Sequence, residues 1–276
     1  MIKETRILIL SENEADDSNL QPEFGLSMWI EADDFRILFD TGQGEAFFYN
    51  AEALGIPLDK TDAVVLSHGH YDHSGGLTLL WEIAPSLPLY LHPAAPHPKF
   101  SASGGNPHPN GMSLENRKAV SERKTQCVWC EKDRIIRSGI GVTGFIPRET
   151  QFENNVGLFY QDEECTIKDN IPDDQALWIE TEHGVVVLCG CGHAGLINTI
   201  NHVLNLSGKS LLGVIGGFHL AKAGDRRINA TVEALKKIRP AILAPCHCTG
   251  EKAVSRFRES FPGALRECHA GAEFHF

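Results

Sequence analysis

Short apolar runs, separated by polar turns and amphipathic stretches, organise the first third of the chain. The apolar runs predict strands at residues 6–10, 25–30, 35–39, 63–66 and 87–91. Apolar side chains at helical spacing predict helices over residues 43–55 and 77–83, and Pro85 ends the second of them. Strands that alternate with helices are typical of an α/β protein.

The C-terminal part of the chain repeats this alternation more regularly. Continuous apolar runs predict strands at residues 176–179, 185–188, 211–215 and 241–244, and the last four residues could close a sheet edge. Helical spacing predicts a helix that begins at Leu196 and two more over residues 228–238 and 251–261. The strands of this half are therefore expected to be buried.

The stretch 92–111 has a different composition. It is rich in proline and glycine, which predicts irregular loop. We expect residues 92–175 to form an insertion that shapes a pocket within a single domain spanning residues 1–276. His92, His97 and His108 lie here without a strand directly before them, so we interpret them as surface or substrate-facing histidines.

Composition and charge narrow the class of protein. The 276 residues are 42% hydrophobic and carry a formal net charge of −11, which argues against a broad basic surface for nucleic acid. No apolar run is long enough for a transmembrane helix, and the N-terminus lacks a secretory signal, so no membrane partner is expected. We interpret the 8 cysteines, including the pair Cys127 and Cys130, as mostly reduced and the protein as cytoplasmic. The oligomeric state stays open.

The densest candidate chemistry follows the predicted strand 63–66. His68, His70, Asp72 and His73 fall within six residues. Three imidazoles and a carboxylate would be costly to bury without a partner, and one kind of partner that satisfies them all is a divalent cation. Imidazole with carboxylate suits zinc, manganese or iron.

Three later strands each precede another histidine. His193 follows the strand 185–188, His219 follows 211–215, and His247 follows 241–244. Because ligands collect at the carboxyl ends of strands in α/β sheets, we expect these histidines to meet the first cluster.

These motifs resemble a known family. The sequence H-x-H-x-D-H after a strand resembles the signature of the metallo-β-lactamase fold superfamily, and Gly190-Cys191-Gly192-His193 and Ala244-Pro245-Cys246-His247 resemble its later motifs. The stretch Gly216-Gly217-Phe218-His219 stands where that superfamily usually has a metal-bridging aspartate. The whole set resembles a subfamily related to an archaeal dihydropteroate synthase of methanopterin biosynthesis. The resemblance implies a four-layer αβ/βα sandwich of two mixed β-sheets flanked by helices, with Asp40-Thr41-Gly42 supporting the metal loop from behind; that aspartate could equally cap the following helix.

The resemblance also implies a ligand set for two divalent metal ions, most simply zinc, with manganese or iron as alternatives. His68, His70 and His193 would hold the first ion, and Asp72, His73 and His247 the second. His219 could be a further ligand or could contact the substrate as a catalytic proton donor, because a neutral imidazole cannot bridge two ions as a carboxylate does. A thiolate from Cys191, Cys246 or Cys248 could also enter this ligand shell.

The function implied is that of a metal-dependent hydrolase. Water activated between the two ions would attack a small phosphorylated or otherwise anionic substrate, and Asp72 would guide its proton. Arg148 could bind the anion or could pair with Glu153, and Asp173 and Asp174 are expected to be turn or edge acids. One alternative is a transferase that joins a dihydropterin methyl diphosphate to an aminobenzene ribosyl phosphate. Another is an iron-dependent redox enzyme on the same fold.

Overall fold

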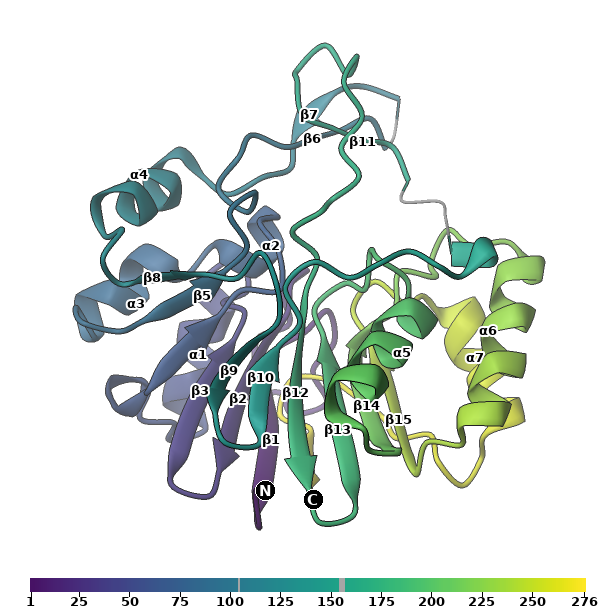
Figure 1. Ribbon diagram of the computed structural model, residues 1–276. Helices are drawn as coiled ribbons and strands as arrows, with labels where there is room; N and C mark the ends of the chain where they lie inside the picture. Colours follow the sequence, from purple (N-terminus) through teal and green to yellow (C-terminus); the bar gives the residue numbers. More distant parts are fainter. Residues whose placement is uncertain (104, 154–156) are drawn as a thin grey trace.

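Two mixed β-sheets pack face to face in the computed structural model, which describes residues 1–103, 105–153 and 157–276 (Figure 1). The first sheet has the strand order β16 (Glu273–His275), β1 (Thr5–Ser11), β2 (Ser27–Ala32), β3 (Phe35–Phe39), β4 (Ala63–Val65), β5 (Leu89–Leu91) and β8 (Cys127–Trp129). The second has the order β15 (Ile242–Cys246), β14 (Leu211–Gly217), β13 (Gly184–Cys189), β12 (Ala176–Thr181), β10 (Ile140–Val142) and β9 (Arg134–Arg137).

Helices cover the outer face of each sheet. The first sheet carries α1 (Glu45–Ala53), α3 (Leu77–Ile83) and α4 (Leu114–Glu122), and the second carries α5 (Leu196–Ser207), α6 (Asp225–Ile238) and α7 (Glu251–Ser260). Figure 1 shows the two sets of helices on opposite sides of the paired sheets. The four-layer αβ/βα sandwich predicted from the sequence is therefore confirmed.

Strands with apolar residues on both faces build these layers. In β1, Ile7 and Ile9 pack between the two sheets, whereas Leu8 and Leu10 pack under the helices of the first sheet. All four are buried. Side chains alternate across a strand, so a continuous apolar run supplies two cores at once. This is why the predicted strands read as unbroken apolar runs.

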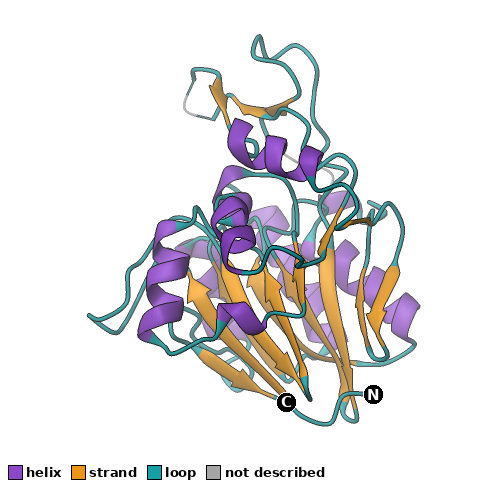
Figure 2. Ribbon diagram, turned by 90° about the vertical axis from the view of Figure 1, so that its left-hand side faces the viewer, coloured by secondary structure: helices purple, strands orange, loops and turns teal. Residues whose placement is uncertain are grey.

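The range 92–175 has two structural roles. β8 belongs to the first large sheet and β9 and β10 to the second, so residues 127–142 are part of the sandwich. The rest includes a small sheet of β6 (Phe100–Ser101), β7 (His108–Pro109) and β11 (Phe159–Tyr160). Figures 1 and 2 show this small sheet projecting above one edge of the sandwich, and both termini lie at the opposite edge.

Parallel pairing directs several strand ends toward the same edge. β3, β4 and β5 run parallel in the first sheet, and β13, β14 and β15 run parallel in the second. The short helix α2 (Tyr71–Ser74) follows β4 at the edge below the small sheet (Figure 1). Among the described residues, no helix is both long and apolar enough to cross a membrane.

Candidate metal centre

The loops after β4, β13 and β15 bring two groups of metal-ligating side chains together. His68, His70 and His193 form one group, and Asp72, His73 and His247 form the other. Within each group the ligand atoms lie within 4.8 Å of one another, and all six residues are buried. The grouping matches the ligand sets that the resemblance implied for the first and second ions.

The first group consists of imidazoles alone. His68 Nε2 lies 2.8 Å from His70 Nδ1, and the His193 ring lies beside both, at centroid distances of 4.8 and 5.0 Å. Neither ring nitrogen of His193 has a hydrogen-bond partner among the described residues, although His193 is only 2% exposed. Buried polar atoms without partners are costly, so these nitrogens fit a bound cation.

The second group combines one carboxylate with two imidazoles. His73 Nε2 lies 3.2 Å from His247 Nε2, and Asp72 Oδ2 lies 3.7 Å from the first of these atoms and 3.4 Å from the second. Three donor atoms that face one point can occupy three positions of a tetrahedral or larger coordination sphere. Nitrogen and oxygen donors suit zinc, manganese or iron.

A single carboxylate orients one histidine from each group. Asp40 Oδ2 accepts a hydrogen bond from His73 Nδ1 at 2.7 Å and another from Ser67 Oγ at 2.6 Å. The Ser67 hydroxyl therefore has no proton left for His68 Nδ1, 2.9 Å away, so the imidazole must donate instead. With Nδ1 as the donor, both histidines direct Nε2 toward their ligand group, and Nε2 is the atom that binds a cation once it carries no proton. The sequence-based suggestion that Asp40 supports the metal loop agrees with this geometry.

The residues that orient His247 come from the N-terminal segment. Glu12 Oε1 accepts the His247 backbone N–H at 2.6 Å, and Asn13 Oδ1 lies 3.1 Å from His247 Nδ1. Neither Glu12 nor Asn13 was among the candidate site residues predicted from the sequence. The available signal was its position, because Glu12 directly follows the strand β1 and is buried.

Arg148 contacts two backbone carbonyls, and its role as an anion-binding residue stays a prediction. Its guanidinium donates to the carbonyl of His193 at 2.7 Å and to that of Asn170 at 2.6 Å. Glu153 instead accepts the backbone N–H groups of Ile197 and Asn198 at the start of α5. Arg148 therefore holds the loop that carries His193, because two of its donors are already used by backbone carbonyls.

Asp173 and Asp174 are buried supports of the same loops, whereas turn or edge acids had been expected. Asp174 Oδ2 accepts the backbone N–H of Ala194 at 2.7 Å, just after His193. Asp173 Oδ2 accepts the N–H of Gly69 at 2.8 Å, between His68 and His70, and its other oxygen pairs with Lys99 Nζ at 2.7 Å. Burial raises the pKa of Asp174 to about 6. The ion pair with Lys99 outweighs burial and lowers the pKa of Asp173.

His219 lies beside the first group and outside both three-residue groups. Its ring centroid lies 4.2 Å from that of His193, and Phe159 of the small sheet covers it at 6.0 Å. Its ligand atom is grouped with the sulfurs of Cys191 and Cys248 instead. This position is compatible with contact to a substrate held below the small sheet.

The remaining candidate residues lie elsewhere. His97 and His108 are exposed. His92 is buried and accepts the Ala94 N–H, so the predicted surface position was wrong for His92. Cys127 and Cys130 are buried free thiols. None of these five residues joins a metal-ligand group in the part of the chain that the structure describes.

Burial sets the charge state of the ligands before any cation binds. It lowers the pKa of His68 and His193 well below the usual value and lowers that of His70 to about 3. Burial has the same tendency at His73, but the carboxylates of Asp72 and Asp40 outweigh it and raise the pKa to about 9. The first group is therefore neutral and ready to coordinate at pH 7, whereas the second holds a proton that a cation must displace.

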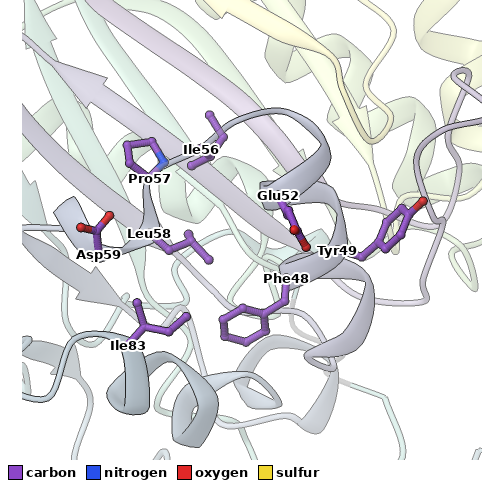
Figure 3. A pocket seen from close by; sticks show the side chains of 8 residues that line it. All are labelled: Phe48, Tyr49, Glu52, Ile56, Pro57, Leu58, Asp59 and Ile83. Atoms are coloured by element: carbon purple, nitrogen blue, oxygen red, sulfur yellow. The ribbon is translucent and has the colours of Figure 1, made fainter.

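A separate apolar groove lies on the outer side of the first sheet. It is formed by Phe48 of α1, Ile83 of α3 and Leu58 of the intervening loop, beside the carboxylates of Glu52 and Asp59 (Figure 3). It includes no residue of the two ligand groups.

Comparisons with known proteins agree with this geometry. A sequence profile described as the metallo-beta-lactamase superfamily matches residues 20–164. The chain is 32% identical to the 7,8-dihydropterin-6-methyl-4-(beta-D-ribofuranosyl)-aminobenzene-5'-phosphate synthase of Methanocaldococcus jannaschii, over 98% of this chain and 96% of the synthase.

Solved structures show the same architecture. Tm1679, described as a metal-dependent hydrolase of the beta-lactamase superfamily, is 30% identical with a TM-score of 0.83 and covers 98% of both chains. The metallo-beta-lactamase fold protein YhfI of Bacillus subtilis shares the fold at 14% identity, with a TM-score of 0.62 over 99% of this chain and 100% of its own. From its sequence and its structure, this chain belongs to the metallo-beta-lactamase superfamily.

Proposed function

We propose that the protein is a metal-dependent hydrolase that cleaves a small phosphorylated or otherwise anionic substrate. The observation that carries this proposal is the adjacency of the two ligand groups. His68 of the first group and His73 of the second have ring centroids 4.3 Å apart and share Asp40 as their orienting carboxylate. Two divalent ions held there would stabilise developing negative charge and lower the pKa of a bound water toward about 7.

The surrounding residues prepare the site for this chemistry. Asp72 stays ionised, because His73 and His247 outweigh the effect of burial and lower its pKa well below the usual value. Asp72 can therefore serve as a ligand and accept a hydrogen bond from an attacking water. Phe159 lies over the first group, with its ring centroid 5.1 Å from that of His70 and 5.2 Å from that of His193. An apolar ring at this position excludes bulk water, which strengthens the electrostatic interactions below it.

Two cationic or proton-donating groups lie beside the small sheet. His219 lies next to His193, below Phe159, and can donate a proton to a leaving group. Lys222 follows three residues later. Its Nζ donates to Ser103 Oγ at 2.6 Å. Ser103 belongs to the part of the chain that carries the small sheet of β6, β7 and β11, which is called the overhanging segment below. The charge of Lys222 at this position favours an anionic substrate over a neutral one.

The test is hydrolysis of phosphate monoesters and diesters by protein loaded with zinc or manganese. We expect inorganic phosphate or alcohol release that a chelator abolishes, that added metal restores, and that Asp72→Asn lowers about 100-fold or more, the scale of a lost catalytic interaction. Asp59→Asn is the matched control, because Asp59 is exposed and pairs with Lys60 at the surface. Equal rates for Asp72→Asn and the native protein would sink the hydrolase proposal.

A synthase reaction is the second candidate. The 32% identity to the methanopterin pathway synthase extends over 98% of this chain, so the similarity includes both ligand groups and the overhanging segment. In that reaction the ions would stabilise a diphosphate leaving group in place of activating a water. Diphosphate release only when a dihydropterin methyl diphosphate and an arylamine are both present would favour the synthase, and release with either one alone would favour hydrolysis.

A further inference from the structure

We propose that the thiolate of Cys191 is a metal ligand that bridges the two ligand groups. This inference rests on the two-metal part of the proposed function and adds a ligand to it. The Cys191 side chain lies between the groups. Its Sγ lies 3.2 Å from His73 Nε2, and it forms a set with His68 and His73 whose ligand atoms lie within 4.8 Å of one another.

The two histidines of that set belong to different groups. His68 presents Nε2 to the first group and His73 presents Nε2 to the second, and both orientations are fixed through Asp40. An atom within coordination reach of the points that both lone pairs face can contact two ions at once. A thiolate has enough lone pairs for this role, and sulfur is a good ligand for zinc.

The backbone around Cys191 holds the thiol in this place. The carbonyl of Gly190 accepts the Gly217 N–H at 3.0 Å, and the carbonyl of Cys191 accepts the Cys248 thiol at 3.3 Å. Cys191 is 4% exposed, so its side chain is buried together with the histidines that it contacts.

The residues at the end of β14 place no side chain between the two ligand groups, so Cys191 can occupy this position. Gly217 packs so tightly that an added Cβ would meet the backbone of Gly190 and would lie 2.8 Å from Cys248 Sγ. Of the two residues that follow, Phe218 is fully buried against the helices, and His219 lies beside Phe159 with its ligand atom near the sulfurs of Cys191 and Cys248 and outside both ligand groups. Cys248 is a weaker candidate, because its sulfur is grouped with Cys191 and His219 and with no residue of the two ligand groups.

The coordination step is a proton exchange without electron transfer. Cysteine would bind a cation as the thiolate, so the Cys191 S–H proton would pass to the solvent buffer as the sulfur took up the cation.

X-ray absorption spectroscopy of the zinc-loaded protein tests the bridge directly. We expect sulfur at about 2.3 Å and about one sulfur per zinc, because one thiolate would be shared by two ions. A terminal thiolate would give about half that sulfur count per zinc, and a shell of only nitrogen and oxygen would give none. Either result, with two ions bound, would overturn the bridge and leave the hydrolase proposal intact. Failure of the native protein to bind two ions would overturn the two-metal proposal first.

Two matched variants identify which cysteine supplies the sulfur ligand. Cys191→Ser should remove the sulfur signal and, in cobalt-loaded protein, the near-ultraviolet thiolate-to-cobalt absorption band. Cys248→Ser should keep both. Loss of the signals in Cys248→Ser alone would overturn the assignment to Cys191. If Cys191→Ser does not fold, the sulfur count of native protein and of Cys248→Ser still decides, because these are the two cysteines that join ligand groups among the described residues.

Discussion

Asp40 connects the two ligand groups through one carboxylate, so its loss should weaken both. Asp40→Ala removes the acceptor of His73 Nδ1 and of Ser67 Oγ. Without it, the ring proton of His73 and of His68 is no longer fixed at Nδ1. Loss of such an orienting partner typically costs about 10- to 100-fold in metal affinity. We expect this loss at both sites, measured by competition with a chromogenic chelator.

The control for this prediction is an exposed aspartate. Asp34→Ala removes a carboxylate that pairs with Arg137 at the surface and should leave metal affinity unchanged. Native affinity in a folded Asp40→Ala protein would show that the histidines orient without this network.

His73 makes a prediction about pH. Its pKa of about 9 in the metal-free protein means that a cation must displace a proton at pH 7. Because the proton competes with the cation, affinity for the second group should rise with pH up to about 9 and fall as the solution is acidified. Calorimetric titration in buffers of different ionisation enthalpy should detect a released proton, and a buffer-independent binding enthalpy would contradict the prediction.

At the scale of elements, Lys99 ties the overhanging segment to the loop of the first group. Its ammonium is buried and pairs with Asp173 at 2.7 Å and Asp169 at 3.2 Å. Asp173 in turn accepts the N–H of Gly69. The overhang and the ligand loop are therefore connected through buried charges, and the helices play no part in this link.

Lys99→Met should lower the free energy of unfolding by about 3–5 kcal/mol, because it leaves two buried carboxylates without their cation. The pKa of Asp173 is lowered in the native protein, so this ion pair stabilises the fold above the unfolded pKa of the acid and is lost as pH falls. The difference between variant and native protein should therefore be larger at pH 7 than at about pH 2, well below the unfolded pKa of an aspartate. Urea denaturation measures it.

Lys118→Met provides the comparison, because Lys118 is exposed and its pair with Glu122 is a surface pair on α4. It should change stability little at either pH. Equal losses for the two variants would mean that the buried pair has no special role.

At the scale of the whole molecule, cation binding should stabilise the sandwich. The ligands come from loops of both sheets, so a cation cross-links the two halves only in the folded state. At about 1,000 times the dissociation constant, one bound ligand adds about 4 kcal/mol to the free energy of unfolding. We expect chelation to lower the melting temperature and excess zinc to restore it.

His193→Ala should reduce this metal-dependent shift, because it removes a ligand supplied by the second sheet. His108→Ala should preserve it, because His108 is exposed and outside the ligand groups. A melting temperature that does not respond to chelation in the native protein would argue that the cation binds without linking the sheets.

Local pattern predicted most of the strands and helices and placed four of the six grouped ligand residues on one loop. The strands β1, β3, β13 and β14 are apolar on both faces, so their burial was readable from composition alone. His68 to His73 are neighbours in the chain, and their spacing already placed them on one loop. By contrast, β9 is a short edge strand with arginines at both ends, and its sequence has no apolar run to reveal it.

The sequence by itself determined the alternating strands and helices and the histidines that follow the strands, because apolar runs and ligand spacing are local properties, and the resemblance of those motifs to a known family implied the two-sheet sandwich. Only the tertiary structure decided what surrounds those histidines. It turned Arg148 toward backbone carbonyls, brought Glu12 and Asn13 to His247, and set Cys191 between the two groups. Those contacts join residues that are far apart in the chain. They depend on how the two sheets pack, and no short stretch of sequence encodes that packing.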